Sequence, residues 1–496
     1  MGIVRKQSIL SSIFIYIGFA IGAVNILLLF PKYFTPEQIG LTRILLDVAL
    51  LFSTLCTLGA IPITLKFFPF YQGYLPKNKN DLPFITILLG TIGSILLILL
   101  LPHFKPMIIR KFGARSPLFV EYFDLVYPFT ITLVFFSLLE AHAWSQKKTV
   151  LSNALKEFAF RLLTTLFILL FIAGILNFNQ FMSVYAYIFL IPVLIFIYSL
   201  SRDGNFPLSF SISKVTSRLK GKMFNFGLFV FGGAMLNIIA RTNDTIIIAS
   251  QSSGGLSDAA VFTIATYLIT VMEVPQRSLI SITTPFIAEA WKNKNLAKID
   301  SLYKKTALNL LILGMAIFSL VLLNIEDATK FLGKDYQALG MIVLISGIAK
   351  LIDLATGLNT QILLLSKYWK FEFLTNMLLV ALCIPLNYWL TKRYNVIGPA
   401  YGNLIALLVF NFTRFLMIWK IFKLQPFTVE NGKAILIGLL VFLVIYIIPD
   451  TGNIFLNVAI RSVSFMLIFG WLILKFNISA DMAGLFELLK ARLRRF

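Results

Sequence analysis

Charged side chains inside long apolar runs are the residues of this sequence that could do chemistry. Four basic residues in such runs have an acidic residue three or four positions away: Arg43 with Asp47, Arg241 with Asp244, Arg277 with Glu273, and Lys350 with Asp353. That spacing puts both members of a pair on one helix face. A charge within a membrane span costs about 2.5–3.5 kcal/mol on insertion scales and faces a packed interior or water. The pairs indicate either self-neutralised packing contacts or a shared wet cavity that is suited to an anion.

Two further arginines and two prolines belong to the same regions. Arg414 and Arg461 have no obvious partner in their own helix, and Arg414 precedes Lys420 by six residues, so snorkelling to the interface is one interpretation for it. Pro62 and Pro275 interrupt apolar runs, and a proline there removes a backbone hydrogen bond and permits bending. Because Pro275 lies between Glu273 and Arg277, we predict a hinge beside that charge pair; the alternative is a static kink.

Signatures of enzymes and metal sites are missing from the sequence. It has only two histidines, His103 and His142, and two cysteines, and it contains no His-Glu-x-x-His motif or glycine-rich phosphate loop. The early polar segment Pro31–Leu41 offers only Glu37, whereas a metal-dependent glycosyltransferase would want an acidic pair there. We therefore predict no catalytic residue, no metal and no cofactor.

The elements that must position the charges are membrane-spanning helices. Hydrophobic residues make up 58% of the 496 residues and charged residues only 13%, against about 45–50% and about 25% in soluble domains. A soluble core cannot absorb that much apolar surface. The net charge of +22 would suggest nucleic acid in a soluble protein. Here it has a simpler source, basic residues in cytoplasmic loops, so we expect no nucleic-acid partner.

The predicted fold is an all-α polytopic membrane protein of about fourteen spans. A span needs about 20 apolar residues, and the runs that qualify are Ser8–Phe30, Leu45–Lys66, Leu82–Leu101, Tyr122–Ala143, Phe158–Leu176, Phe181–Leu200, Phe224–Ser250, Ala259–Ile287, Ala307–Leu323, Leu339–Leu364, Phe373–Leu390, Val396–Ile421, Ala434–Ile448 and Ile454–Lys475.

The distribution of basic residues predicts the orientation. With the N-terminus in the cytoplasm, the inside segments carry nearly three times as many Lys and Arg residues as the outside segments, which predicts that both termini are cytoplasmic. One outside loop, residues 102–119, is basic all the same, through Lys105, Arg110, Lys111 and Arg115. An interfacial helix with snorkelling side chains is the simplest interpretation of it.

A weak internal repeat predicts the domain organisation. Gly22–Asn25 resembles Gly233–Asn237, and Lys-Asn-Lys-Asn occurs at Lys77–Asn80 and again at Lys292–Asn295. An offset of six spans gives two parallel repeats. The prediction is an N-lobe at 1–216, a C-lobe at 217–424, a terminal helix pair at 425–478 and an amphipathic cytoplasmic tail at 479–496, where basic residues would meet anionic lipid.

Several segments resemble the polysaccharide and O-antigen flippase branch of the multidrug/oligosaccharidyl-lipid/polysaccharide exporter superfamily. They are Phe34–Leu41, Asn243–Ile248, Ala260–Tyr267, the two proline dipeptides Val274-Pro275 and Thr284-Pro285, Leu332–Tyr336, Leu386-Asn387 and Ile397–Ala400. Pro399-Ala400 departs from the Gly-Ala that is usual in the family. The similarity covers roughly Leu10 to Phe427, and each motif is loose.

The resemblance implies a function in cell-surface polysaccharide or lipopolysaccharide biosynthesis. Such flippases move polyisoprenyl-pyrophosphate-linked oligosaccharide across the bacterial cytoplasmic (inner) membrane by alternating access, and the partners implied are membrane lipid and glycan polymerase or chain-length proteins. Arg43 and Arg277 match cavity arginines of related lipid II flippases, but the first span has no basic residue beyond Lys6. We therefore expect Arg43, Arg241, Arg277 and Lys350 to bind substrate, and Asp47, Asp244, Glu273 and Asp353 to pair with them or couple an ion.

Two other functions remain open at this point. A cation-coupled antiporter of drugs or small molecules would belong to the same superfamily, and Asp244 is the one analogue of its usual acidic coupling residue. A membrane enzyme of envelope glycan assembly is the second alternative. The flippase is favoured over the antiporter by the count of fourteen spans rather than twelve. It is also favoured because the charged residues within the spans are largely basic, which suits an anionic cargo.

Overall fold

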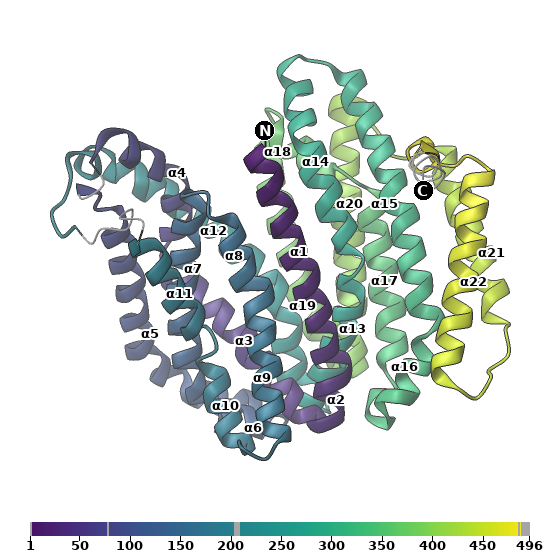
Figure 1. Cartoon of the computed structure of the whole chain (residues 1–496), viewed down its shortest axis with the longest axis horizontal. Coiled ribbons are helices and arrows are strands. Elements are labelled where there is room, and N and C mark those ends of the chain that lie inside the picture. The colour runs from purple at the N-terminus through teal and green to yellow at the C-terminus, as the bar shows by residue number, and fades with distance from the viewer. Residues whose placement is uncertain (1, 77–78, 203–208, 485–486, 488–496) are drawn as a thin grey trace. The chain divides into compact units, whose positions relative to one another are not determined.

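The computed structural model describes residues 2–76, 79–202, 209–484 and 487 (Figure 1). It is 86% helical and contains no strand in that part of the chain, so the predicted all-α fold is confirmed. Among the described residues, eleven helices are long and apolar enough to cross a membrane, or twelve if one bent pair counts as a single span. The apolar run at 369–422, counted once among these, contains two antiparallel helices. The count of fourteen stays a prediction.

Backbone contacts divide the chain into two compact units, Met1–Ala260 and Val261–Phe496, which we call the N-terminal unit and the C-terminal unit. This boundary differs from the predicted lobe boundary after residue 216. The reason is that α12 (Lys214–Gln251) packs along helices of the N-terminal unit. At its start, Thr216 bonds to Tyr71 at 2.6 Å and to Asp81 at 2.7 Å. The division into lobes stays a prediction.

The N-terminal unit is a bundle of long and broken helices. In chain order they are α1 (Gly2–Val24) with η1 (Asn25–Leu29) and α2 (Phe30–Tyr33), α3 (Pro36–Cys56), α4 (Ala60–Tyr74), α5 (Leu82–Phe112), α6 (Pro117–Glu121), η3 (Phe123–Leu125), α7 (Val126–Ser145), α8 (Thr149–Asn153), η4 (Ala154–Ala159), α9 (Phe160–Ile172), α10 (Phe178–Ala186), α11 (Leu190–Arg202) and α12.

Local sequence explains where α3 and α4 begin. Thr35 caps α3 by accepting from the backbone of Gln38 at 3.3 Å, while the Gln38 side chain accepts from the backbone of Thr35 at 3.0 Å, which is a complete capping box. The chain then breaks between Cys56 and Ala60, where Gly59 has a φ of 79°. That left-handed conformation suits glycine. What the sequence presents as one apolar span is therefore two helices.

Helix α5 explains the basic segment 102–119. It has 31 residues, or about 46 Å, against a hydrocarbon core of about 30 Å. Residues 102–112 continue this helix rather than forming a separate interfacial one. Lys105 pairs with Asp124 at 3.0 Å, and Arg110 and Lys111 lie in the last turn, where cations favour the helix dipole.

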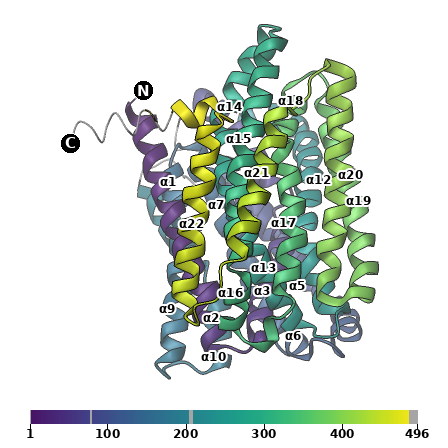
Figure 2. The ribbon, with the colours of Figure 1, turned by 90° about the vertical axis from the view of Figure 1, so that its right-hand side faces the viewer.

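The C-terminal unit continues the pattern. Its helices are α13 (Leu256–Thr270, which contains the boundary), α14 (Glu273–Lys292), α15 (Leu296–Leu323), α16 (Ile325–Leu332), η5 (Lys334–Tyr336), α17 (Leu339–Ala355), α18 (Asn359–Leu365), α19 (Trp369–Tyr394), η6 (Asn395–Ile397), α20 (Gly398–Phe422), α21 (Val429–Tyr446) and α22 (Ile454–Lys475). Figure 2 shows α19 and α20 side by side as the hairpin that η6 closes.

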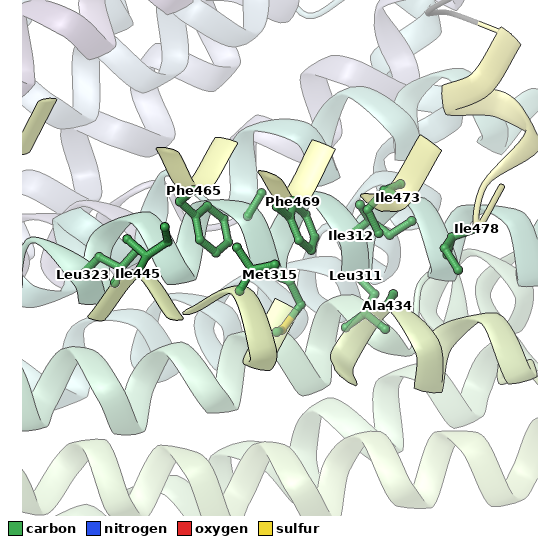
Figure 3. Close-up of a cluster of buried hydrophobic side chains, with 12 residues drawn as sticks. Leu311, Ile312, Met315, Leu323, Ala434, Ile445, Phe465, Phe469, Ile473 and Ile478 are labelled. Carbon is green, nitrogen blue, oxygen red and sulfur yellow. The ribbon is translucent and has the colours of Figure 1, made fainter. Parts of the chain in front are cut away.

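The last two helices pack onto α15 through an apolar cluster (Figure 3). Phe465 and Phe469 of α22 lie against Met315 of α15 and are buried. Arg461, which lacked a partner in its own helix, pairs with Asp327 of α16 at 3.0 Å. The terminal helix pair is thus part of the C-terminal unit. Residues 485–486 and 488–496 of the predicted amphipathic tail lie outside the described residues.

Candidate functional site

The N-terminal unit brings together three of the predicted charges. On α3, Arg43 Nε donates to Asp47 Oδ2 at 2.8 Å. The Asp47 side chain is 1% exposed and that of Arg43 is 36% exposed. α12 packs against α3, and the positive charge of its exposed Arg241 also acts on the Asp47 carboxylate. Two cations therefore share one buried carboxylate here.

Asp244 lies one helical turn from Arg241 on α12 and is half-buried. It is flanked by buried Asn243 and Thr245. In the same unit, Asp47 Oδ1 is buried and has no hydrogen-bond partner among the described residues. This carboxylate oxygen can therefore accept a hydrogen bond from a further donor.

The C-terminal unit contains the larger group, which we call the α14/α17 charge cluster: Glu273 and Arg277 of α14, and Lys350 and Asp353 of α17. Arg277 donates to Glu273 Oε2 at 2.9 Å, and Lys350 donates to Asp353 at 3.0 Å. The other oxygen of Glu273 lies 3.5 Å from the Lys350 ammonium. These contacts join the two predicted i, i+3 and i, i+4 pairs into one network across two helices.

Neighbouring polar groups fix one side of this cluster. Gln276 donates to Asp353 at 3.2 Å. Thr356, at the end of α17, donates to buried Asn411 of α20 at 3.1 Å. Lys350 and Asp353 are 15% and 23% exposed, whereas the Arg277 side chain is 62% exposed. A guanidinium in a span is expensive in lipid, so the uncovered Arg277 indicates a water-facing surface.

Two helix breaks position these charges. α13 and α14 are bent by 44° at their junction, and Glu273 begins α14, where an acidic side chain favours the helix dipole. Pro275 is the third residue of α14, and Pro62 is the third residue of α4 after the break at Gly59. A proline in a first turn costs no helix hydrogen bond. Both predicted hinge prolines thus follow a break; whether the breaks move stays a prediction.

Arg414 does not snorkel. Its side chain is 2% exposed and is held by Thr375 at 2.9 Å, Thr360 at 2.6 Å, Glu372 at 3.3 Å and Asn376 at 3.3 Å. The guanidinium also lies 4.0 Å from the centre of the Phe410 ring. The sequence analysis did not identify Glu372 as the partner of Arg414, because Glu372 lies just before the apolar run 373–390. A hairpin of α19 and α20 would have pointed to the pair, since it brings residues before and after η6 together.

No group of three His, Cys, Asp or Glu side chains in the described part of the chain could hold a metal ion. His142 is buried and bonds to Thr86 at 2.8 Å, and both cysteines are buried. These residues pack the interior. The charged groups described above are therefore the side chains on which a functional argument can be built.

Solved structures with the same fold belong to flippases and transporters. The structure resembles the lipid II flippase MurJ in an inward closed conformation, with a TM-score of 0.72 and 15% identity over 93% of this chain and 97% of that chain. It also resembles a multidrug resistance MATE family transporter of the MOP superfamily in two conformations. The inward-facing form gives a TM-score of 0.58 and 16% identity over 80% of this chain and 93% of that chain. The outward-facing form gives a TM-score of 0.53 and 14% identity over 83% of this chain and 94% of that chain.

No protein-family model and no curated relative matches the sequence. At such low identities the structural likeness establishes the fold, which is the one shared by MurJ and the MATE transporters. This agrees with the superfamily resemblance found in the sequence motifs. The solved neighbours are transporters and flippases rather than enzymes.

Proposed function

We propose that this protein is a flippase that moves polyisoprenyl-pyrophosphate-linked oligosaccharide across the bacterial inner membrane by alternating access. The observation that carries the proposal is the exposed Arg277, which shares Glu273 with Lys350 inside helices of a flippase-like fold. Arginine offers phosphate a bidentate fork, and charge-assisted bonds of this type are the strong ones. The sugar would travel in water while the lipid tail stays in the bilayer.

The membrane potential supplies an energy source for such cargo. A pyrophosphate diester carries about two negative charges, and each charge gains about 2.3 kcal/mol per 100 mV, so outward transfer gains roughly 4.6 kcal/mol. The cell interior is negative, so the force points outward. The gain is kept only if the cationic side chains do not cross most of the field with the cargo. Rocking of the two repeats, with bends beside Pro62 and Pro275, would provide the motion.

A cation-coupled antiporter is the second candidate, and the likeness to MATE transporters favours it. Asp244, half-buried beside Arg241, would then be the coupling residue. The basic residues weigh against cationic drugs as cargo, because Arg43, Arg241 and Arg277 would repel them. The two candidates differ in cargo charge and in energy source, so both can be tested in one system.

The test uses proteoliposomes that contain a lipid-linked oligosaccharide pyrophosphate. We expect Arg277→Ala to lower the flipping rate at least tenfold and Arg277→Lys to fall between it and the wild type, because lysine keeps the charge but loses the fork. Arg218→Ala, which removes an exposed arginine near the start of α12, is the matched control and should flip normally. Normal flipping by Arg277→Ala would refute the assignment of Arg277.

The same vesicles test the energy source. An imposed potential, positive on the side that receives the cargo, should accelerate flipping without any ion gradient. No response to potential, combined with dependence on a proton or sodium gradient and on Asp244, would replace the uniport by an antiport.

A further inference from the structure

The Glu273 carboxylate has an unusual position within the α14/α17 charge cluster. Its Oε2 accepts from Arg277 at 2.9 Å on its own helix, and its Oε1 lies 3.5 Å from Lys350 on a different helix. One carboxylate therefore spans two cations that come from two helices. Two anionic oxygens bridging a guanidinium and an ammonium form the arrangement that a phosphate of a bound cargo would also adopt.

The two carboxylates of the cluster are not equivalent. Asp353 receives a hydrogen bond from Gln276 at 3.2 Å as well as from Lys350, and it also interacts electrostatically with Arg414 of α20. The contacts of Glu273 are with Arg277 and Lys350. Glu273 also lies on the open side of the cluster, because it is 34% exposed and its partner Arg277 is 62% exposed. Glu273 is thus the acid that an incoming anion meets.

The four side chains together carry no net charge, since two are basic and two are acidic. An anion that merely approached the cluster would gain little. It gains fully only when it replaces Glu273 as the partner of Arg277 and Lys350. A displaced, ionised carboxylate then lies beside the negative charges of the cargo without its two cationic partners, which favours its neutral form.

We propose that Glu273 is an internal stand-in for the cargo phosphate, and that each binding event displaces it and protonates it. The inference rests on the proposed function, because the displacing group is a pyrophosphate diester. The carboxylate takes one proton from water and becomes a carboxylic acid, while the two cations pass to the phosphate oxygens. With Glu273 neutral, Arg277 and Lys350 outweigh the charge of Asp353 by one, so the cluster balances one of the two negative charges of the cargo.

The surroundings of Glu273 make it the titrating group. The charges that act on it are Lys350 of α17 and Arg277 of α14. Of the helices packed against α14, α18 carries no ionisable side chain, and α15 carries its ionisable residues in its first three turns. There Lys298 pairs with Glu289, four turns along α14 from Glu273. Asp353 keeps Gln276 when the anion binds.

Binding linked to proton uptake gives a definite pH dependence. Affinity for the anion rises as pH falls, by up to about tenfold per pH unit for one proton. The probe must not titrate itself, so we choose a dialkyl pyrophosphate diester, which lacks the second phosphate ionisation near pH 6. The measurement is isothermal titration of the full-length protein in lipid nanodiscs at pH 5.5, 6.5, 7.5 and 8.5.

We expect the wild type to bind the probe more tightly at each lower pH and to take up about one proton per probe, read from buffers of different ionisation enthalpy. Glu273→Gln should bind at least tenfold tighter than the wild type at pH 7.5, with no pH dependence. Asp353→Asn is the matched control: it also removes one acid from the cluster, yet it should keep the pH slope. Glu273→Ala, which also lacks the titrating carboxylate, should lose the pH slope as well and serves if Glu273→Gln does not fold.

Wild-type binding that is independent of pH, or an unchanged slope in Glu273→Gln, overturns the inference. Because flipping of the lipid-linked cargo is measured separately, such a result leaves the flippase proposal standing. Absence of probe binding to both the wild type and Glu273→Gln at pH 5.5 overturns the inference and removes the anion site from the proposed function as well.

Discussion

At the scale of single residues, we expect substitution of Arg414 to destabilise the protein strongly. It is buried and holds side chains of α18 and α19 through Thr360, Thr375 and Glu372. Arg414→Ala leaves Glu372 without its counter-charge and empties a packed site, and breaking a buried pair costs about 3–5 kcal/mol. We expect a large fall in the unfolding temperature of the purified protein in detergent. Lys420→Ala, on the exposed face of the same helix, should change stability by less than about 0.5 kcal/mol. Equal behaviour of the two variants would show that Arg414 is not a structural hub.

The contrast between short-range and long-range pairs shows what could be read from sequence at this scale. Spacing along one helix predicted Arg43 with Asp47, Glu273 with Arg277, and Lys350 with Asp353, and these contacts form at 2.8, 2.9 and 3.0 Å. The bridge from Lys350 to Glu273 and the pair of Arg414 with Glu372 join different helices. Such contacts depend on which helix faces pack together, and helical periodicity in one segment carries no information about its neighbour.

At the scale of elements, close helix packing rests on glycines at defined positions. A Cβ built on Gly93 of α5 would lie 2.0 Å from the carbonyl oxygen of Cys56 at the end of α3. We expect Gly93→Ala to destabilise the protein by about 1–3 kcal/mol, because the backbone must move to accept the methyl group. Gly233→Ala in α12 is the control, since nothing lies within 4 Å of its added Cβ. Removing a glycine from a helix interior there should stabilise slightly. Thermal unfolding of both variants is the measurement. A Gly93→Ala protein as stable as the wild type would contradict the close contact between α5 and the end of α3.

Apolar runs predicted the helices well but their interruptions poorly. The spans expected at 45–66, 259–287 and 339–364 are each divided, at Gly59, between α13 and α14, and at Gly357. The apolar composition continues across every break, so hydropathy alone does not reveal them. Pro62 and Pro275 marked two of the breaks. The third depends on Gly357, which has a positive φ and on which an added Cβ would lie 3.0 Å from the Ala307 Cα; both features emerge only from packing.

For the whole molecule, the orientation in the membrane is the property to test. The charge distribution predicts that Ser253 faces outward and Ser301 faces the cytoplasm, and both residues are exposed in the structure. In intact cells we expect Ser253→Cys to react with a membrane-impermeant maleimide and Ser301→Cys to react only after permeabilisation. The native Cys56 and Cys383 are buried and should contribute little background. The reverse labelling pattern would invert the predicted topology.

The cluster formed by α14 and α17 also has a consequence for biosynthesis. The ribosome makes α15 and α16 between the two halves of the cluster, so Glu273 and Arg277 reach the translocon well before Lys350 and Asp353. Each half is a self-neutralised pair on one helix face, which lowers the cost of inserting it alone. The contact between Glu273 and Lys350 is then added to the two existing pairs once both helices are in the bilayer. Removing one charge of either pair should therefore make co-translational insertion less favourable and also alter the finished site. The yield of inserted chain can be measured separately from transport.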